Sequence, residues 1–232
     1  MNSNTYDQTP SRIIASAQEG VHERLESTVT KHLATNFGKP ISKFNTDNYD
    51  SAMRQINREK IIFDSGCGNG RSTFQLARNN PDAFVIGIDK SAARLSKSRN
   101  NKGEQDPSEI DNYCLVRADL IDFLRLASND GIALHKHYFL YPNPWPKSQH
   151  LQRRWHGSPV FKDIIQLGGV FEVRSNWKIY AEEFKVSLGI AGITSMVSEM
   201  NHDNHHYISD FEAKYHRSGQ ALWQRLSTKS II

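Results

Sequence analysis

Five short apolar runs, rich in β-branched and aromatic residues, recur along the chain between residues 61 and 173. They cover residues 61–63, 83–88, 113–116, 138–141 and 170–173. Helical patterns follow three of them, at residues 71–79, 91–100 and 120–127. Strands that alternate with helices form βαβ units, whose parallel sheet is buried between layers of helices. The alternation therefore predicts an α/β fold built on a mostly parallel sheet.

The segment before residue 60 has a different pattern. Residues 1–15 are polar and are expected to form a loose arm. Apolar residues then recur every four positions at Val21, Leu25, Val29 and Leu33, which predicts a helix that residues 38–40 end. A second helix is expected at 49–58. We therefore predict an N-terminal arm with helices over residues 1–59 and one α/β domain over residues 60–232.

The C-terminal part of the chain breaks the alternation. A helix predicted at residues 180–188 precedes a strand at 193–197, a polar loop at 201–206 and a last strand that starts near Tyr207. Two strands without an intervening helix form an antiparallel hairpin. We expect this hairpin to close one edge of the sheet.

A glycine-rich loop follows the first predicted strand. It reads Asp64-Ser65-Gly66-Cys67-Gly68-Asn69-Gly70. Glycines at a strand-to-helix turn let a ligand approach the backbone closely. A dinucleotide fingerprint has the spacing G-x-G-x-x-G, whereas this loop has G-x-G-x-G after an acid. A carboxylate there repels phosphate but attracts a sulfonium or ammonium group, which favours S-adenosylmethionine as cofactor.

Two further acids end the next predicted strands. Asp89 ends the second strand, where a carboxylate can accept hydrogen bonds from both hydroxyls of a ribose. Asp119 follows the third strand, where it or a neighbouring backbone group can contact the adenine edge. The alternative is that the glycines only form turns and the acids only cap helices. The predicted cofactor-binding residues are Asp64, Gly66, Gly68, Gly70, Asp89, Lys90, Ala118 and Asp119.

Basic residues gather in two segments that contain no acid. The first, residues 131–162, holds Lys136, Lys147, Arg153, Arg154 and Lys162, and the second, residues 213–232, holds Lys214, Arg217, Arg225 and Lys229. The whole chain is formally +4, so the remainder is mildly acidic. This asymmetry suggests a polyanionic partner, although solvated basic surfaces of no consequence are also common.

The fourth predicted strand ends in Tyr141-Pro142-Asn143-Pro144-Trp145-Pro146-Lys147. Prolines on both sides of Asn143 fix the backbone around that side chain. Trp145 offers a face on which a base can stack, and the cations that follow can neutralise phosphates. If the segment is only structural, Trp145 belongs to the core and the cations are solvated.

This segment resembles the bacterial tRNA (guanine-N7)-methyltransferase family, whose fourth strand ends in Pro-Asp-Pro-Trp followed by Lys and an Arg-rich run. Two other segments are similar to it as well: 175–182, with Ser175-Asn176-Trp177, and 209–223, with Ser209-Asp210-Phe211-Glu212. The resemblance covers about residues 61–223. It implies a Rossmann-like class I methyltransferase with a mostly parallel seven-stranded sheet and an antiparallel edge strand.

The resemblance also implies roles for single residues. Asn143 falls on the position taken as catalytic, and the cofactor is S-adenosylmethionine. The implied substrate-binding residues are Lys147, Arg153, Arg154, Asn176, Ser209 and Glu212. The sequence departs from the family at four positions, where Asn143 and Asn176 replace Asp, Gln149 replaces Arg and Ser209 replaces Thr.

The expected function is methyl transfer to N7 of a guanine in tRNA. Guanine N7 carries an in-plane lone pair, so a general base is not obligatory and Asn143 is compatible with activity. One alternative is a methyltransferase of the same fold that acts on a different RNA or a small heterocycle. The other is a non-catalytic RNA-binding relative, which would not need the whole glycine loop.

Other features bound the remaining possibilities. No apolar run approaches the length of a membrane span, and Cys67 and Cys114 are too few for a disulfide framework, so we expect a cytoplasmic protein without a membrane partner. The histidines His202, His205 and His206 match no standard zinc spacing, and we expect no metal. The sequence leaves open whether the protein is a monomer or a homodimer.

Overall fold

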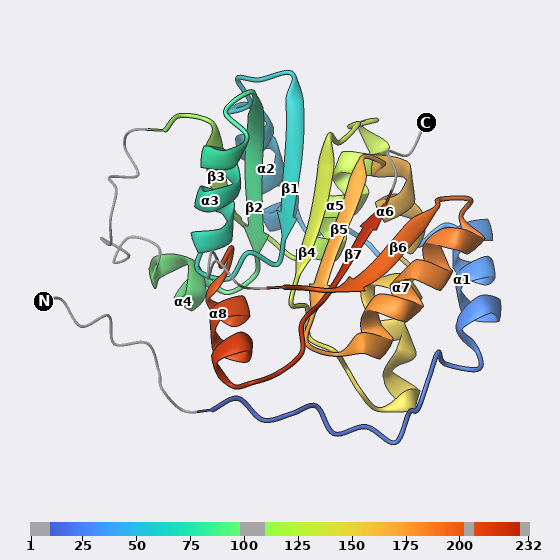
Figure 1. Ribbon diagram of the computed structural model, residues 1–232. Coiled ribbons are helices and arrows are strands. Elements are labelled where there is room, and N and C mark those ends of the chain that lie inside the picture. The colour runs from blue at the N-terminus through green and yellow to red at the C-terminus, as the bar shows by residue number, and fades with distance from the viewer. Residues whose placement is uncertain (1–9, 98–109, 202–206, 228–232) are drawn as a thin grey trace, which may run out of the picture.

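The computed structural model describes residues 10–97, 110–201 and 207–227. Its centre is a single seven-stranded sheet in the order β3-β2-β1-β4-β5-β7-β6 (Figure 1). The strands are β1 Lys60–Ser65, β2 Ala83–Asp89, β3 Tyr113–Arg117, β4 Lys136–Leu140, β5 Val170–Ser175, β6 Ser195–Glu199 and β7 Trp223–Ser227. The five strands predicted up to residue 173 are therefore confirmed, with small shifts at their ends.

The directions of the strands match the predicted fold class. Strands β1 to β5 run parallel, as five repeated apolar runs separated by crossovers require. β7 pairs antiparallel with β5 on one side and with the edge strand β6 on the other. The mostly parallel sheet and the antiparallel pair at its edge are thus both confirmed.

Helices cover both faces of the sheet. The α-helices are α1 Leu25–Ala34, α2 Lys43–Met53, α3 Arg71–Asn79, α4 Ala92–Leu95, α5 Leu120–Asn129, α6 Phe161–Leu167, α7 Lys178–Ile190 and α8 Asp210–Arg217, and two short 3-10 helices are η3 Ser148–Arg153 and η4 Trp155–Gly157. On one face, apolar residues of α1, α2, α5, α6 and α7 form one large cluster with the sheet. On the other face, Leu76 and Ala77 of α3 pack with Ile62 and Val85.

The N-terminal helices share the core of the α/β domain. Leu25 and Val29 of α1 and Tyr49 of α2 are buried in the same cluster as α5 and α7. Helix α2 begins six residues before the predicted start, because the side chain of Ser42 accepts a hydrogen bond from the Asn45 amide and caps the helix there. The predicted bounds of 49–58 were therefore wrong.

The predicted hairpin after residue 193 is also wrong. Helix α8 lies between β6 and β7, where a strand had been expected from Tyr207. Ser209 caps the helix by accepting from the Glu212 amide at 3.2 Å. Acids in its first turn and bases in its last turn complement the helix dipole. Of the helix predicted at 91–100, α4 covers residues 92–95, and residues 98–100 lie outside the described part.

Two glycines let α3 pack closely against the sheet. A Cβ at Gly87 in β2 would lie 2.2 Å from Thr73 Oγ1 and 2.8 Å from Leu115 Cδ2. Gly70, the N-cap residue of α3, has φ of +80°, and a Cβ there would lie 2.6 Å from Leu115 Cδ1. These contacts fix the distance between the glycine loop and the second and third strands.

We expect Gly87→Ala to lower the free energy of unfolding by about 1–3 kcal/mol, because the added methyl group overpacks the α3 interface. Denaturant unfolding followed by circular dichroism measures the change. The matched control is Gly189→Ala in α7, where a Cβ meets nothing within 4 Å. That control should stabilise the helix by about 0.5–1 kcal/mol. Equal stabilities for the two variants would contradict the packing argument.

Candidate functional site

The carboxyl ends of β1, β2, β3 and β4 meet at one edge of the sheet, at the bottom of Figure 1. Asp64 of β1 lies opposite Gly87 of β2 and Tyr138 of β4 in the strand register. Open α/β sheets bind ligands at this edge. The glycine loop and the loop after β4, which the sequence singled out separately, therefore belong to one site.

The glycine loop has the conformation that its residues predict. Gly66 and Gly68 have φ of +88° and +63°, in the left-handed region that favours glycine. A Cβ built on either residue meets nothing within 4 Å. The loop therefore presents bare backbone to open space, as a ligand cradle requires.

Asp64 lies beneath this loop rather than on its surface. Its Oδ2 accepts hydrogen bonds from Ser72 Oγ at 2.6 Å and from Thr73 Oγ1 at 2.7 Å, both in the first turn of α3. Burial raises the pKa of Asp64 to about 6, although the two hydroxyl groups oppose the shift. A nearby cation would restore the charged form of this carboxyl group.

Asp89 ties the end of β2 to the glycine loop. Its Oδ2 accepts from the Gly68 amide at 3.0 Å, and its Oδ1 accepts from the Ser91 amide at 2.8 Å. Arg94 of α4 also pairs with Oδ1 at 3.1 Å. A carboxylate offers about four acceptor positions, so these three contacts leave one for a ligand.

The other predicted cofactor residues have mixed surroundings. Asp119 caps α5 by accepting from the Ile121 amide at 3.0 Å. Ala118 is buried, and its amide donates to the Asp89 carbonyl at 3.3 Å. Lys90 is exposed. Asp119 and Ala118 therefore lie at the edge of the sheet where the cofactor is expected, but these hydrogen bonds join them to the protein itself.

The loop after β4 is strained at two places. Tyr141 and Trp145 have φ of +51° and +47°, which side chains with a Cβ rarely adopt. Asn143 lies exposed between them, and its Oδ1 accepts from the Trp145 amide at 3.3 Å. Such strain persists only where surrounding contacts hold it, and it concentrates at functional sites.

The two arginines of the basic run have different environments. Arg153 is exposed, and its guanidinium lies 4.8 Å from the centre of the Trp145 ring. Arg154 is fully buried and cannot reach a phosphate on the surface. The assignment of Arg154 to substrate binding is therefore wrong. Lys147 is exposed at the start of η3.

Arg154 instead belongs to a buried network around Glu183 of α7. The Glu183 carboxylate accepts from Arg154 Nη1 at 2.6 Å, His156 Nε2 at 2.8 Å and Gln18 Nε2 at 2.6 Å. Burial alone would raise the pKa of Glu183, but His156 first and then Arg154 hold it at about 2. Arg154 Nη2 also donates to the carbonyl oxygen of Trp145, whose backbone is strained, at 3.1 Å. The network thus fixes the loop that carries Asn143.

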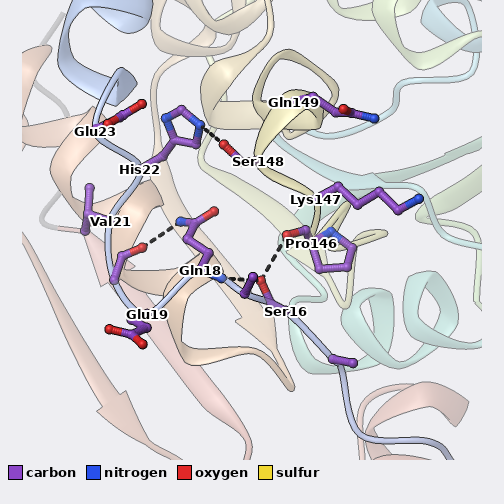
Figure 2. Close-up of a pocket in the computed structure, with 13 residues that line it drawn as sticks. Ser16, Gln18, Glu19, Val21, His22, Glu23, Pro146, Lys147, Ser148 and Gln149 are labelled. Atoms are coloured by element: carbon purple, nitrogen blue, oxygen red, sulfur yellow. Dashed lines mark hydrogen bonds between the residues drawn. The ribbon is translucent and has the colours of Figure 1, made fainter.

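The N-terminal arm completes this network. In Figure 2 it runs along the start of η3, where Ser16 Oγ donates to the Pro146 carbonyl at 3.0 Å and His22 Nε2 lies 2.7 Å from Ser148 Oγ. The two segments line a cavity of about 670 Å³. Further along, the Ser11 amide donates to Ser218 Oγ at 2.9 Å. The described part of the arm, from Pro10 onward, is therefore held against the domain and is not loose.

The remaining substrate candidates are Ser209 and Glu212, at the start of α8, and Asn176, just after β5. Glu212 is fully buried, and its Oε2 accepts from Tyr141 Oη at 3.2 Å and from Arg174 Nη1 at 2.8 Å. Arg174 also pairs with Glu172, so the three side chains carry one net negative charge near the end of β4. Ser209 acts as the helix cap. Asn176 donates to Gln220 Oε1 at 2.8 Å.

The structure distributes the basic residues less simply than the sequence suggested. Arg154 and Arg225 are buried, and Lys136 begins β4 at the opposite edge of the sheet. Lys229 lies outside the described residues, as do His202, His205 and His206. Among described residues, no group of three or more His, Cys, Asp or Glu side chains could hold a metal ion. Likewise, no described helix is long and apolar enough to cross a membrane.

Sequence patterns did not reveal several residues that shape the site. Arg174, Glu183 and Gln18 come from distant parts of the chain and match no local motif. Asp210 lies between Ser209 and Glu212 in the segment that resembles the family, yet the resemblance implies no role for it. Cys67 is buried in the glycine loop, where burial raises the pKa of its thiol, so it is not an activated nucleophile.

The parallel sheet, the glycine loop and the acids at the strand ends define a nucleotide-binding α/β protein of the methyltransferase type. Residues 58–225 match a family described as putative methyltransferase, and the chain belongs to that family. The match runs from just before β1 into β7 and includes the glycine loop and the loop after β4.

The chain is also similar to curated proteins that have a more specific name than the family. The chain is 26% identical over 171 residues to a tRNA (guanine-N(7)-)-methyltransferase of Pseudoalteromonas atlantica, covering 70% of each chain. It is 26% identical over 172 residues to the enzyme of that name from Yersinia pestis (strain Pestoides F), again covering 70% of each.

Solved structures support the fold. A 16S rRNA (adenine(1408)-N(1))-methyltransferase from Catenulisporales acidiphilia, solved with its cosubstrate SAM, has a TM-score of 0.54 and 17% identity over 84% of this chain and 95% of its own. An antibiotic-related methyltransferase has a TM-score of 0.54 and 19% identity over 84% of this chain and 97% of its own. These similarities concern the fold alone.

We expect Glu183→Gln to lower the free energy of unfolding by about 3 kcal/mol at pH 7, because it leaves the charge of Arg154 buried without its partner. Denaturant unfolding measures the difference. The control Glu182→Gln removes the neighbouring, partly exposed carboxylate of the pair with Lys178, and should change stability by less than about 0.5 kcal/mol.

The loss of stability in Glu183→Gln should depend on pH. The folded-state pKa of Glu183 is about 2 against a reference of 4.5, so its stabilising charge is present above pH 4.5 and is lost as the pH falls toward 2. The deficit of Glu183→Gln should therefore shrink over that range. A deficit that is unchanged at pH 2 would contradict the role assigned to the carboxylate.

Proposed function

We propose that the protein transfers a methyl group from S-adenosylmethionine to N7 of a guanine in tRNA. The observation that carries the proposal is that one edge of the sheet brings together an open glycine loop between two acids and the strained loop of Asn143. The relatives named tRNA (guanine-N(7)-)-methyltransferase support the choice of acceptor.

The residues present fit the cofactor. The space above Gly66 and Gly68, which a Cβ would fill, lets a ligand contact the loop backbone. Asp89 keeps one acceptor position for a ribose hydroxyl group. A cationic neighbour would lower the raised pKa of Asp64 and stabilise its charged form. Bound there, S-adenosylmethionine would supply an electrophilic methyl carbon on a positively charged sulfur.

The acceptor side needs positioning more than proton transfer. Guanine N7 has an in-plane lone pair, so its methylation removes no proton and leaves a cationic purine. Near-attack geometry and a field that tolerates this charge are then the main requirements. Asn143 offers an amide oxygen, and Glu212 with its ion-pair partners adds one net negative charge nearby.

Guanine also has donors on its Watson–Crick edge, N1–H and the 2-amino group. Glu212 Oε1 is buried and has no hydrogen-bond partner among the described residues. Once uncovered, this oxygen would be an acceptor that matches the Watson–Crick edge of guanine. Exposed Lys147 and Arg153 would contact phosphates, and Trp145 would stack on a base with the face that Arg153 does not cover.

The proposal is tested by incubating the purified protein with labelled S-adenosylmethionine and unmodified bulk tRNA, followed by nucleoside mass spectrometry. We expect 7-methylguanosine as the product. Transfer of label to another RNA, or to a small heterocycle, would reject the acceptor but retain the enzyme class. Failure to bind S-adenosylmethionine in calorimetry would reject methyl transfer altogether.

We expect Asn143→Asp to keep or raise the rate of methyl transfer to tRNA. Asn143 is exposed, so a carboxylate about 4 Å from the cationic purine would contribute about 1 kcal/mol, or about fivefold in rate. Single-turnover kinetics measures the change, with Asn48→Asp in α2 as control. A large loss in Asn143→Asp would show that the site has been reshaped for another acceptor.

Cofactor binding should release protons from Asp64. With a pKa of about 6, roughly half of the Asp64 groups are protonated at pH 6, and a bound cation lowers that pKa. We expect release of up to about half a proton per S-adenosylmethionine. Calorimetry at pH 6 in two buffers of different ionisation enthalpy measures it. Asp64→Asn should abolish the release and Asp82→Asn should not; equal release in both variants would contradict a contact between Asp64 and the cation.

A further inference from the structure

The first residue of α8 is bound to both sides of Gly70 in the glycine loop. Asp210 Oδ2 accepts from Asn69 Nδ2 at 2.8 Å, and Asp210 Oδ1 accepts from Arg71 Nη1 at 2.6 Å. Asn69 lies between two glycines with positive φ, and Arg71 begins α3. One carboxylate therefore spans the point where the glycine loop becomes a helix.

The same turn of α8 carries Glu212, which faces the loop after β4. Its Oε2 is held by Tyr141 and Arg174, whereas its Oε1 is buried and has no hydrogen-bond partner among the described residues. A buried carboxylate oxygen without a donor is costly and calls for an explanation. A shift of α8 that exposes this oxygen to a donor would remove the cost.

The first turn of α8 makes Asp210 and Glu212 move together. The Ser209 side chain caps this turn by accepting from the Glu212 amide, and the helix runs on to Arg217. A displacement of the glycine loop that pulls on Asp210 therefore also displaces Glu212. The two halves of the site are linked by two residues of one helical turn.

The ion pair between Arg71 and Asp210 is too exposed to add much to the stability of the fold, but it can still influence the position of α8. The side chains of Arg71 and Asp210 are 32% and 38% exposed, and partly exposed ion pairs contribute little to the free energy of folding. A small free energy is still enough to bias a helix between two positions.

We propose that Asp210 couples the glycine loop to the acceptor pocket, so that ligand binding at the loop sets the position of α8 and the access to Glu212. This rests on the proposed function, since the loop ligand is S-adenosylmethionine. Coupling of binding free energies is reciprocal, so an acceptor that contacts Glu212 also tightens cofactor binding. Asp210 is then a positioning residue, not a catalytic one.

The experiment measures hydrogen exchange of the α8 amides with and without saturating S-adenosylmethionine, which needs no acceptor. In the wild-type protein we expect the cofactor to change exchange in α8 by about fivefold, a typical coupling. In Asp210→Asn the change should fall below about twofold, while calorimetry shows cofactor affinity within about threefold of wild type. A purely structural residue would alter exchange in α8 with and without cofactor to the same extent.

Two further variants complete the test. Asp82→Asn removes an ion pair with Lys60 at the other edge of the sheet and should behave as wild type. Arg71→Gln breaks the link from the loop side and leaves the α8 sequence intact. It should therefore show the same loss of the cofactor effect even if Asp210→Asn unfolds α8.

The outcomes separate this inference from the proposed function. No cofactor effect on α8 in the wild type, or an undiminished effect in both linkage variants, would overturn the coupling. A cofactor effect that needs Asp210, without formation of 7-methylguanosine, would support the coupling and reject the acceptor. Absence of S-adenosylmethionine binding would overturn both.

Discussion

The buried carboxylate of Glu183 is the contact on which the conformation of the loop after β4 depends. It accepts hydrogen bonds from the N-terminal arm, through Gln18, and from the segment after β4, through Arg154 and His156. Because Arg154 also holds the carbonyl of Trp145, the network over-determines a loop whose backbone is strained. An ion pair below the surface thereby fixes the conformation of the exposed residues around Asn143.

Helix α8 performs a related task across the site. Its first turn contacts the glycine loop through Asp210, and it contacts Tyr141, just after β4, through Glu212. The polar residues of this turn thus make contacts beyond helix capping.

Local sequence signals predicted the parts of the fold that local physics controls. The apolar runs located β1 to β5, and the helix expected at residues 71–79 has the bounds of α3. The glycines Gly66 and Gly68 predicted the positive φ values of the cofactor loop. Prediction failed where a cap decided the outcome, since Ser42 begins α2 early and Ser209 begins α8 where a strand was expected.

The sequence by itself determined the α/β class, the glycine loop and the edge of the sheet where ligands bind, because periodicity and turn chemistry act over a few residues. Only the tertiary structure decided which charges are exposed. Arg153 and Arg154 are neighbours in the sequence, yet one stacks on Trp145 at the surface and the other is buried against Glu183. That difference depends on partners far along the chain. The sequence shows that a side chain is charged, but only the tertiary structure shows whether it is buried or exposed to water.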